Sequence, residues 1–105
     1  MQEVLATGDR VITVSGEIGF NGFANTELDR LLRERGIADI LLAGLVTSLC
    51  IDSTGRAGYE RGYRVTILSD CTAARTGSEQ DFYCQNIFPL YGHVAEYTQC
   101  LDTFA

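Results

Sequence analysis

One cysteine in this sequence lies where a thiol could act as a nucleophile. Cys50 falls within residues 44–54, between a short apolar run at residues 40–43 and a helix-like segment that stops before Gly62. This pattern predicts a buried strand followed by a helix, with Cys50 at the corner or in the first helical turn. Unpaired backbone N–H groups and the positive end of the helix dipole favour an anion there. Cysteines in such positions tend to have a lowered thiol pKa, and the thiolate is the nucleophilic form.

The other residues that could bind a metal or act as nucleophiles are scattered. The spacings between Cys50, Cys71, Cys84 and Cys100 match neither metal-binding pairs nor a short disulfide framework, so we expect reduced thiols. We interpret the last three as core residues, and a buried, inert thiol is the alternative for Cys50 as well. His93 is the one histidine and has no partner at ligand spacing. We therefore expect no metal site and no cofactor.

Length and charge exclude several functional classes. The 105 residues suffice for one domain with a single core, and we assign residues 1–105 to it. A net charge of −6 without any basic run argues against nucleic acid as a partner. No leader-like or membrane-spanning segment is visible, so we expect a cytoplasmic protein without a membrane partner. A nucleotide-binding module is a weak alternative, because the glycines at 16, 19 and 22 lack the G-x-G-x-x-G spacing.

Strand-like and helix-like segments alternate along the chain. Strands are predicted at residues 11–14, 37–45, 64–68 and 93–96, and helices at 26–35, around and after Cys50, at 79–86 and from Thr98. Thr26 and Ser78 are the predicted N-caps of two helices. Alternation of this kind implies parallel strands joined by right-handed crossovers. We predict an α/β fold of three layers, with a mostly parallel sheet, helices on both faces and a short N-terminal part.

Three aromatic residues are candidates for a substrate pocket. Phe20 and Phe23 lie in a glycine-rich loop that follows the first predicted strand, and Tyr59 lies on the helix after Cys50. Loops at strand ends often line binding sites, and the three rings would suit an apolar or planar ligand. The alternative is that these rings cap the hydrophobic core.

The motifs around Cys50 resemble those of the isochorismatase-like cysteine hydrolase family. The likeness runs over about residues 8–104 and is carried by six segments: residues 23–29, 31–33, 36–37, 44–54, 57–65 and 70–74. It implies the three-layer α/β fold and hydrolysis of a C–N or related bond in a small molecule. It also implies that Cys50 is the nucleophile and that a non-proline cis peptide lies at Val46 and Thr47. In such sites, backbone N–H groups, including that of Cys50, face the substrate oxyanion.

Two further catalytic residues implied by the resemblance are missing. An aspartate belongs at the end of a first strand that would precede this chain, so we expect the chain to correspond to the C-terminal portion of the usual domain. A lysine belongs near Ser15 or Glu17, and this sequence contains no lysine. A carboxylate at Glu17 facing Cys50 would oppose thiolate formation by like-charge repulsion, or it could itself be the general base. Three accounts remain: part of a longer protein, a hydrolase with an altered base, or an inactive member kept for ligand binding or assembly.

The missing first strand also bears on partners. Without it, one sheet edge or face would expose apolar surface that needs a cover. We therefore expect a homo-oligomer or pairing with the missing N-terminal segment, besides a small-molecule substrate.

Overall fold

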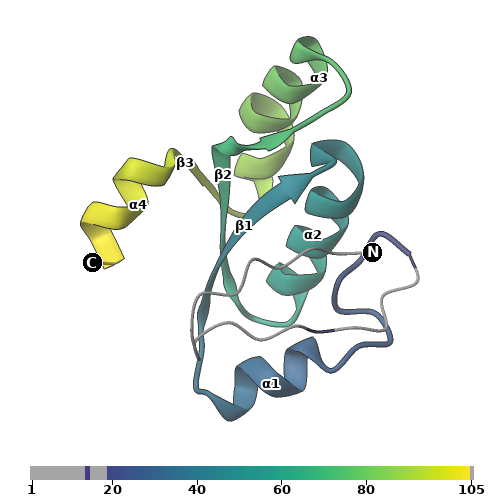
Figure 1. Cartoon of the computed structure of the whole chain (residues 1–105), viewed down its shortest axis with the longest axis vertical. Coiled ribbons are helices and arrows are strands. Elements are labelled where there is room, and N and C mark those ends of the chain that lie inside the picture. Colours follow the sequence, from purple (N-terminus) through teal and green to yellow (C-terminus); the bar gives the residue numbers. More distant parts are fainter. Residues whose placement is uncertain (1–13, 15–18, 105) are drawn as a thin grey trace.

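Three parallel strands form the sheet. The computed structural model describes Val14 and residues 19–104, and in it β1 (Asp39–Leu45), β2 (Arg64–Ala73) and β3 (His93–Ala95) lie in the order β1-β2-β3 (Figure 1). Both neighbouring pairs are parallel, which confirms the prediction. The predicted strand at residues 11–14, apart from Val14, and the candidate base Glu17 lie outside the described residues.

A register shift brings the end of β2 beside the end of β1. Leu42 pairs with Ile67, but Gly44 pairs with Thr72, so β2 contributes several extra residues between these two pairings. Gly44 has φ +122°, a backbone conformation that residues with a Cβ rarely adopt. The predicted end of β2 at residue 68 was therefore too early, because the strand continues to Ala73. The extension places polar residues of β2 next to the turn that contains Cys50.

The helical segments follow the predicted order. They are α1 (Leu28–Glu34), the π-helical turn η1 (Thr47–Ile51), α2 (Asp52–Glu60), α3 (Gly77–Phe82), the π-helical η2 (Tyr83–Ile87), the 3₁₀ turn η3 (Phe88–Leu90) and α4 (Tyr97–Phe104). In the described part of the chain, no helix is long and apolar enough to cross a membrane.

The residues that precede α1 and α3 differ from the predicted N-caps. The N-cap of α1 is Glu27, one residue after the predicted Thr26, although the Thr26 hydroxyl accepts the Leu28 N–H at 3.3 Å. The prediction of Ser78 as a cap was wrong, because the extended residue before α3 is Thr76, whose hydroxyl accepts the Glu79 N–H at 3.1 Å. Ser78 lies within the helix instead.

Helices lie on both sides of the sheet, as predicted (Figure 1). On one face, Ile51, Val65, Ile67 and Phe88 form a buried cluster against which Ile40, Leu42 and Tyr91 also pack. A second cluster of Phe23, Ala57 and Tyr63 joins α1 to α2. The buried Leu68 points to the opposite face by strand alternation, and α4 lies on the side of the sheet away from α2 (Figure 1).

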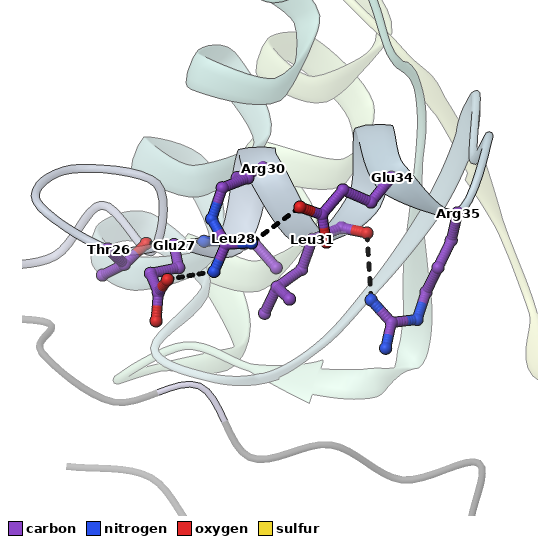
Figure 2. Close-up of polar contacts among 7 residues, drawn as sticks. All are labelled: Thr26, Glu27, Leu28, Arg30, Leu31, Glu34 and Arg35. Carbon is purple, nitrogen blue, oxygen red and sulfur yellow. Dashed lines mark hydrogen bonds and ion pairs between the residues drawn. The ribbon is translucent and has the colours of Figure 1, made fainter.

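The outer face of α1 carries charged pairs rather than core contacts. Arg30 Nη1 lies 2.7 Å from Glu34 Oε2, and Arg30 also contacts Glu27 (Figure 2). Arg35 Nη1 donates to the Leu31 carbonyl at 3.2 Å. Exposed pairs of this kind contribute roughly 0–1 kcal/mol each. Leu28 and Leu32 instead pack α1 against the core. The Tyr63 hydroxyl also donates to Asp29 Oδ1 at 2.6 Å.

Candidate active site

Cys50 lies between the carboxyl end of β1 and the start of α2. It belongs to η1, and its side chain is partly exposed. The predicted corner position is confirmed, although the turn is π-helical and α2 begins only at Asp52. In open parallel sheets, ligands bind outside the carboxyl ends of the strands. Cys50 is thus placed where a bound small molecule would be found.

The backbone of η1 closes around one carbonyl group. Val46 O accepts the Leu49 N–H at 3.0 Å and the Ile51 N–H at 3.2 Å, so both neighbours of Cys50 are bound to the same oxygen. A non-proline cis peptide joins Leu45 to Val46. The expectation of a cis bond at Val46 and Thr47 was wrong by one residue. The cis bond follows the last residue of β1, and Thr47 already begins the π-helical turn.

Polar residues of η1 and α3 meet at the beginning of this turn, and we call them the turn cluster: Thr47, Ser48, Glu79 and Gln80. Thr47 Oγ1 donates to Gln80 Oε1 at 2.6 Å, and Ser48 Oγ donates to Glu79 Oε1 at 2.8 Å. Thr47 is fully buried. Its side chain therefore faces α3.

A second polar group, which we call the helix cluster, holds the start of α2: Asp52, Arg56 and Tyr91. Asp52 is 7 % exposed, and its Oδ1 accepts the Tyr91 hydroxyl at 3.0 Å and the Arg56 Nε–H at 3.0 Å. Burial, and then the Asp52 carboxylate, raise the pKa of Tyr91, so its hydroxyl stays protonated and remains a donor. A Cβ at Gly55 would lie 2.7 Å from the Tyr91 hydroxyl oxygen. Only glycine lets Tyr91 lie this close to α2.

Glu79 is an ionised acceptor at neutral pH. The hydrogen bond from the Arg75 side chain, and then that from Ser48, lower the pKa of Glu79 to about 2. Hydrogen bonds from charged and neutral donors favour the ionised form of a carboxyl group. Glu79 therefore accepts from Ser48 and Arg75 throughout the physiological range.

The other thiols lie in different environments. Cys100 is 7 % exposed, which confirms its core interpretation, and Cys84 is half-buried. The core interpretation of Cys71 was wrong, because this residue is exposed in the register-shifted part of β2. Loss of hydration, and then the Asp70 carboxylate, raise the pKa of the Cys71 thiol. Burial, and then a neighbouring carboxylate, raise that of Cys84. None of the described residues form a group of three or more that could hold a metal ion.

The predicted pocket aromatics lie in different places. Phe23 is 4 % exposed and stacks on Tyr63, with ring centroids 5.7 Å apart, so it belongs to the core between α1 and α2. Tyr59 is 55 % exposed and its ring lies 6.1 Å from that of Tyr91. Phe20 is 53 % exposed, and its carbonyl accepts the Thr54 hydroxyl of α2 at 3.3 Å. Phe23 and Tyr59 thus belong to separate clusters.

Comparison with known proteins places this arrangement in a family. The model of the isochorismatase domain matches residues 2–99. The chain belongs to the isochorismatase family. Over 78 residues it is 38% identical to ureidoacrylate amidohydrolase RutB from Methylorubrum extorquens, a match covering 73% of this chain and 32% of that protein.

Solved isochorismatase-family structures share the fold. An isochorismatase-like hydrolase from Alkaliphilus metalliredigens matches with a TM-score of 0.86 and 29% identity, over 96% of this chain and 55% of that chain. The nicotinamidase/pyrazinamidase of Bacillus subtilis matches with a TM-score of 0.68 and 30% identity, over 76% of this chain and 44% of that chain. This chain therefore spans about a third of the curated relative and about half of these solved chains.

Sequence reasoning singled out Cys50 as a candidate but did not point to the residues that hold its turn and the following helix in this isochorismatase-family chain. Gln80, Glu79 and Tyr91 reach the site from segments about 30 to 40 residues further along the chain. No periodic pattern marks such contacts. The motif around Cys50 does contain Asp52, and a carboxylate in the first turn of a helix is a signal for an anchoring role. A pocket lined by Ile37, Ala38, Asp39 and Leu41 lies at the amino end of β1, away from Cys50.

Proposed function

We propose that this chain carries the nucleophile of a hydrolase that cleaves a C–N bond in an amide-like or ureide-like small molecule. The observation that carries the proposal is the partly exposed Cys50 thiol in the turn joining β1 to α2. The names of two relatives, an amidohydrolase and a nicotinamidase, support hydrolysis of a C–N bond. The match covers only 32% of RutB, so hydrolytic activity of the protein that contains this chain is itself part of the proposal.

The reaction is an acyl transfer. The Cys50 thiolate attacks the substrate carbonyl carbon, and the new C–S bond turns the carbonyl oxygen into an oxyanion. In this proposal, backbone N–H groups at Val46, Thr47 and Cys50 donate to that oxygen, and each such donor typically contributes about 3–4 kcal/mol. The C–N bond then breaks, and the leaving nitrogen takes a proton. Water hydrolyses the thioester, which releases the acid and restores the thiol.

The proton acceptor is the open part of the proposal. The chain has no lysine, and the candidate base Glu17 lies outside the described residues. We propose that either Glu17 or a carboxylate outside this sequence takes the thiol proton. Glu17→Gln tests the first possibility, since it keeps the side-chain shape and removes the base. Turnover that survives this substitution would assign the base elsewhere.

The direct test is hydrolysis of a panel of small amides, ureides and enol ethers, with ammonia or amine release as the readout for the first two. We expect Cys50→Ser to lower turnover on the order of 10³-fold or more, because it removes the nucleophile. The matched control is Cys71→Ser, an exposed thiol outside the turn. Equal turnover of Cys50→Ser and the parent chain, or no turnover of any panel member by the parent, would contradict the proposal.

The alternative is an inactive family member that serves in ligand binding or assembly. Within the described residues, β1 pairs only with β2, and Leu41 and Leu45 on it are 42% and 67% exposed. An edge strand with exposed apolar side chains favours association with another chain. We propose that the protein forms oligomers in either case. A monomer in light scattering at micromolar concentration would contradict this expectation.

A further inference from the structure

Two neighbouring residues of α3 bind the two residues of η1 that begin the turn, ahead of Cys50. Gln80 accepts from the hydroxyl of Thr47, and Glu79 accepts from the hydroxyl of Ser48. These contacts cross more than 30 positions of the sequence. The end of β1 and α3 are therefore connected through side chains as well as by the chain path through β2.

Gln80 uses both ends of its amide. While Oε1 accepts from Thr47, Nε2 donates to Thr72 Oγ1 at 3.0 Å and to the Ser69 carbonyl at 3.2 Å. A contact of 3.6 Å with Cys84 Sγ completes its surroundings. Only an amide supplies an acceptor and two donors at one position, so a carboxylate or an apolar group would leave partners unpaired. Gln80 thus links η1 to the extended end of β2.

Glu79 is fixed in the same manner by its own neighbours. Its Oε1 accepts from the Arg75 backbone N–H at 3.2 Å, and its Oε2 lies 2.7 Å from Arg75 Nη2. The Thr76 hydroxyl accepts the Glu79 N–H. This arrangement is related to a capping box, in which the side chains at the start of a helix bind backbone donors reciprocally. Contacts within its own segment therefore fix the Glu79 carboxylate that accepts the Ser48 hydroxyl.

We propose that Gln80 and Glu79 are positioning residues for the Cys50 thiol. Neither side chain is placed against the sulfur; they act through Thr47 and Ser48, which begin the turn. Because the Leu49 and Ile51 N–H groups both bind Val46 O, the turn is a compact unit. A shift of its first residues moves Cys50 and the backbone N–H groups beside it. This inference rests on the proposed function of Cys50 as the nucleophile.

The test is site-resolved alkylation of the 105-residue chain by iodoacetamide from pH 6 to 9, measured by mass spectrometry. Gln80→Leu keeps the approximate volume and removes every hydrogen bond. We expect the Cys50 rate to fall at least several-fold, while the buried Cys100, which is not a contact of Gln80, stays as protected as in the parent. The matched control is Gln85→Leu, an exposed glutamine of η2, which should leave the Cys50 rate within twofold.

A second pair of variants covers the case in which Gln80→Leu does not fold. Thr47→Val removes the hydroxyl that donates to Gln80, and Thr47→Ser restores it. We expect Thr47→Val to slow alkylation of Cys50 and Thr47→Ser to react as the parent does. Equal Cys50 rates in Thr47→Val and Thr47→Ser would overturn the proposal, as would slowing accompanied by increased labelling of Cys84 and Cys100.

The outcomes separate the two proposals. A parent chain in which Cys50 reacts no faster than Cys71 contradicts the proposed function itself. A fast Cys50 that none of the turn-cluster variants affects contradicts only the positioning role. Where the parent turns over an amide, the positioning role also predicts a lower kcat for Gln80→Leu with KM changed less.

Discussion

The two polar clusters on either side of Cys50 are built differently. In the turn cluster, before Cys50, the hydroxyls of Thr47 and Ser48 meet side chains of α3 through contacts between distant parts of the chain. In the helix cluster, after Cys50, Asp52 binds Arg56 of its own helix and Tyr91 from beyond η3. One cluster fixes a turn, and the other fixes a helix against the core.

This difference predicts different consequences when the clusters are broken. The helix cluster lies beside the buried residues Ile51 and Phe88, and Tyr91 packs against them, so its loss should lower the free energy of unfolding. The turn cluster lies at the sheet end, where its loss should change the chemistry of Cys50 more than the stability of the fold. The following substitutions test this contrast.

The largest effect on stability is expected for Asp52→Ala. This substitution removes the acceptor of Tyr91 and Arg56, and unpaired buried polar groups cost energy. We expect the free energy of unfolding to fall by about 2–3 kcal/mol in urea titrations. Under native conditions, the alkylation rate of Cys50 should stay within twofold of the parent. The exposed Asp81→Ala is the control; an equal effect of the two substitutions would contradict the role of the helix cluster.

Gly55→Ala should have the next largest effect. The added Cβ would lie 2.7 Å from the Tyr91 hydroxyl oxygen and 3.0 Å from a ring carbon, so the ring must move. We expect a loss of about 1–2 kcal/mol, as for other overpacked sites. Gly77→Ala is the matched control, because nothing lies within 4 Å of its added Cβ. If thermal unfolding gives the same midpoint for both variants, the close packing of Tyr91 on α2 does not stabilise the fold.

Tyr91→Phe removes only the hydroxyl of the helix cluster. Asp52 keeps Arg56 as a partner, and the ring can stay between α2 and η3. We expect a loss of about 1 kcal/mol, the usual contribution of one hydrogen bond. Tyr59→Phe, on a ring that is 55% exposed, should be neutral in the same urea titration. A neutral Tyr91→Phe would show that the Tyr91–Asp52 hydrogen bond does not stabilise the fold.

The smallest effect on stability is expected for Glu79, and it depends on pH. The pKa of Glu79 in the folded chain, about 2, lies below its ordinary value of 4.5. The stabilisation from its carboxylate is therefore complete above pH 4.5 and is lost as the pH falls toward 2. We expect Glu79→Gln to lower the melting temperature at pH 6 and to differ less from the parent at pH 3. A constant difference between the two melting curves would exclude the carboxylate as the cause.

Local patterns in the sequence predicted most of the fold. The glycine after α2, the apolar run of β1 and the alternation of elements all depend on neighbouring residues, and these predictions were confirmed. Such features are visible in a sequence because their causes lie within a few residues.

The features that were missed depend on distant contacts. The extension of β2 to Ala73 follows from pairing with Gly44 and Leu45, and no residue near position 68 signals it. Thr76, not Ser78, caps α3, although both side chains carry a hydroxyl. The backbone is extended at Thr76 and already helical at Ser78, and the sequence does not show this difference. The partners of Thr47 and Asp52 are likewise set by how η1, α3 and η3 meet in space.

The rate at which each of the four thiols reacts with iodoacetamide at pH 7 tests the central claim most directly. Cys71 is more exposed than Cys50, so access alone would make Cys71 the faster thiol. We predict instead that Cys50 reacts at least about tenfold faster than the other three, since the pKa of the Cys71 and Cys84 thiols is raised and Cys100 is buried. Equal rates for Cys50 and Cys71, or a faster Cys71, would contradict the account.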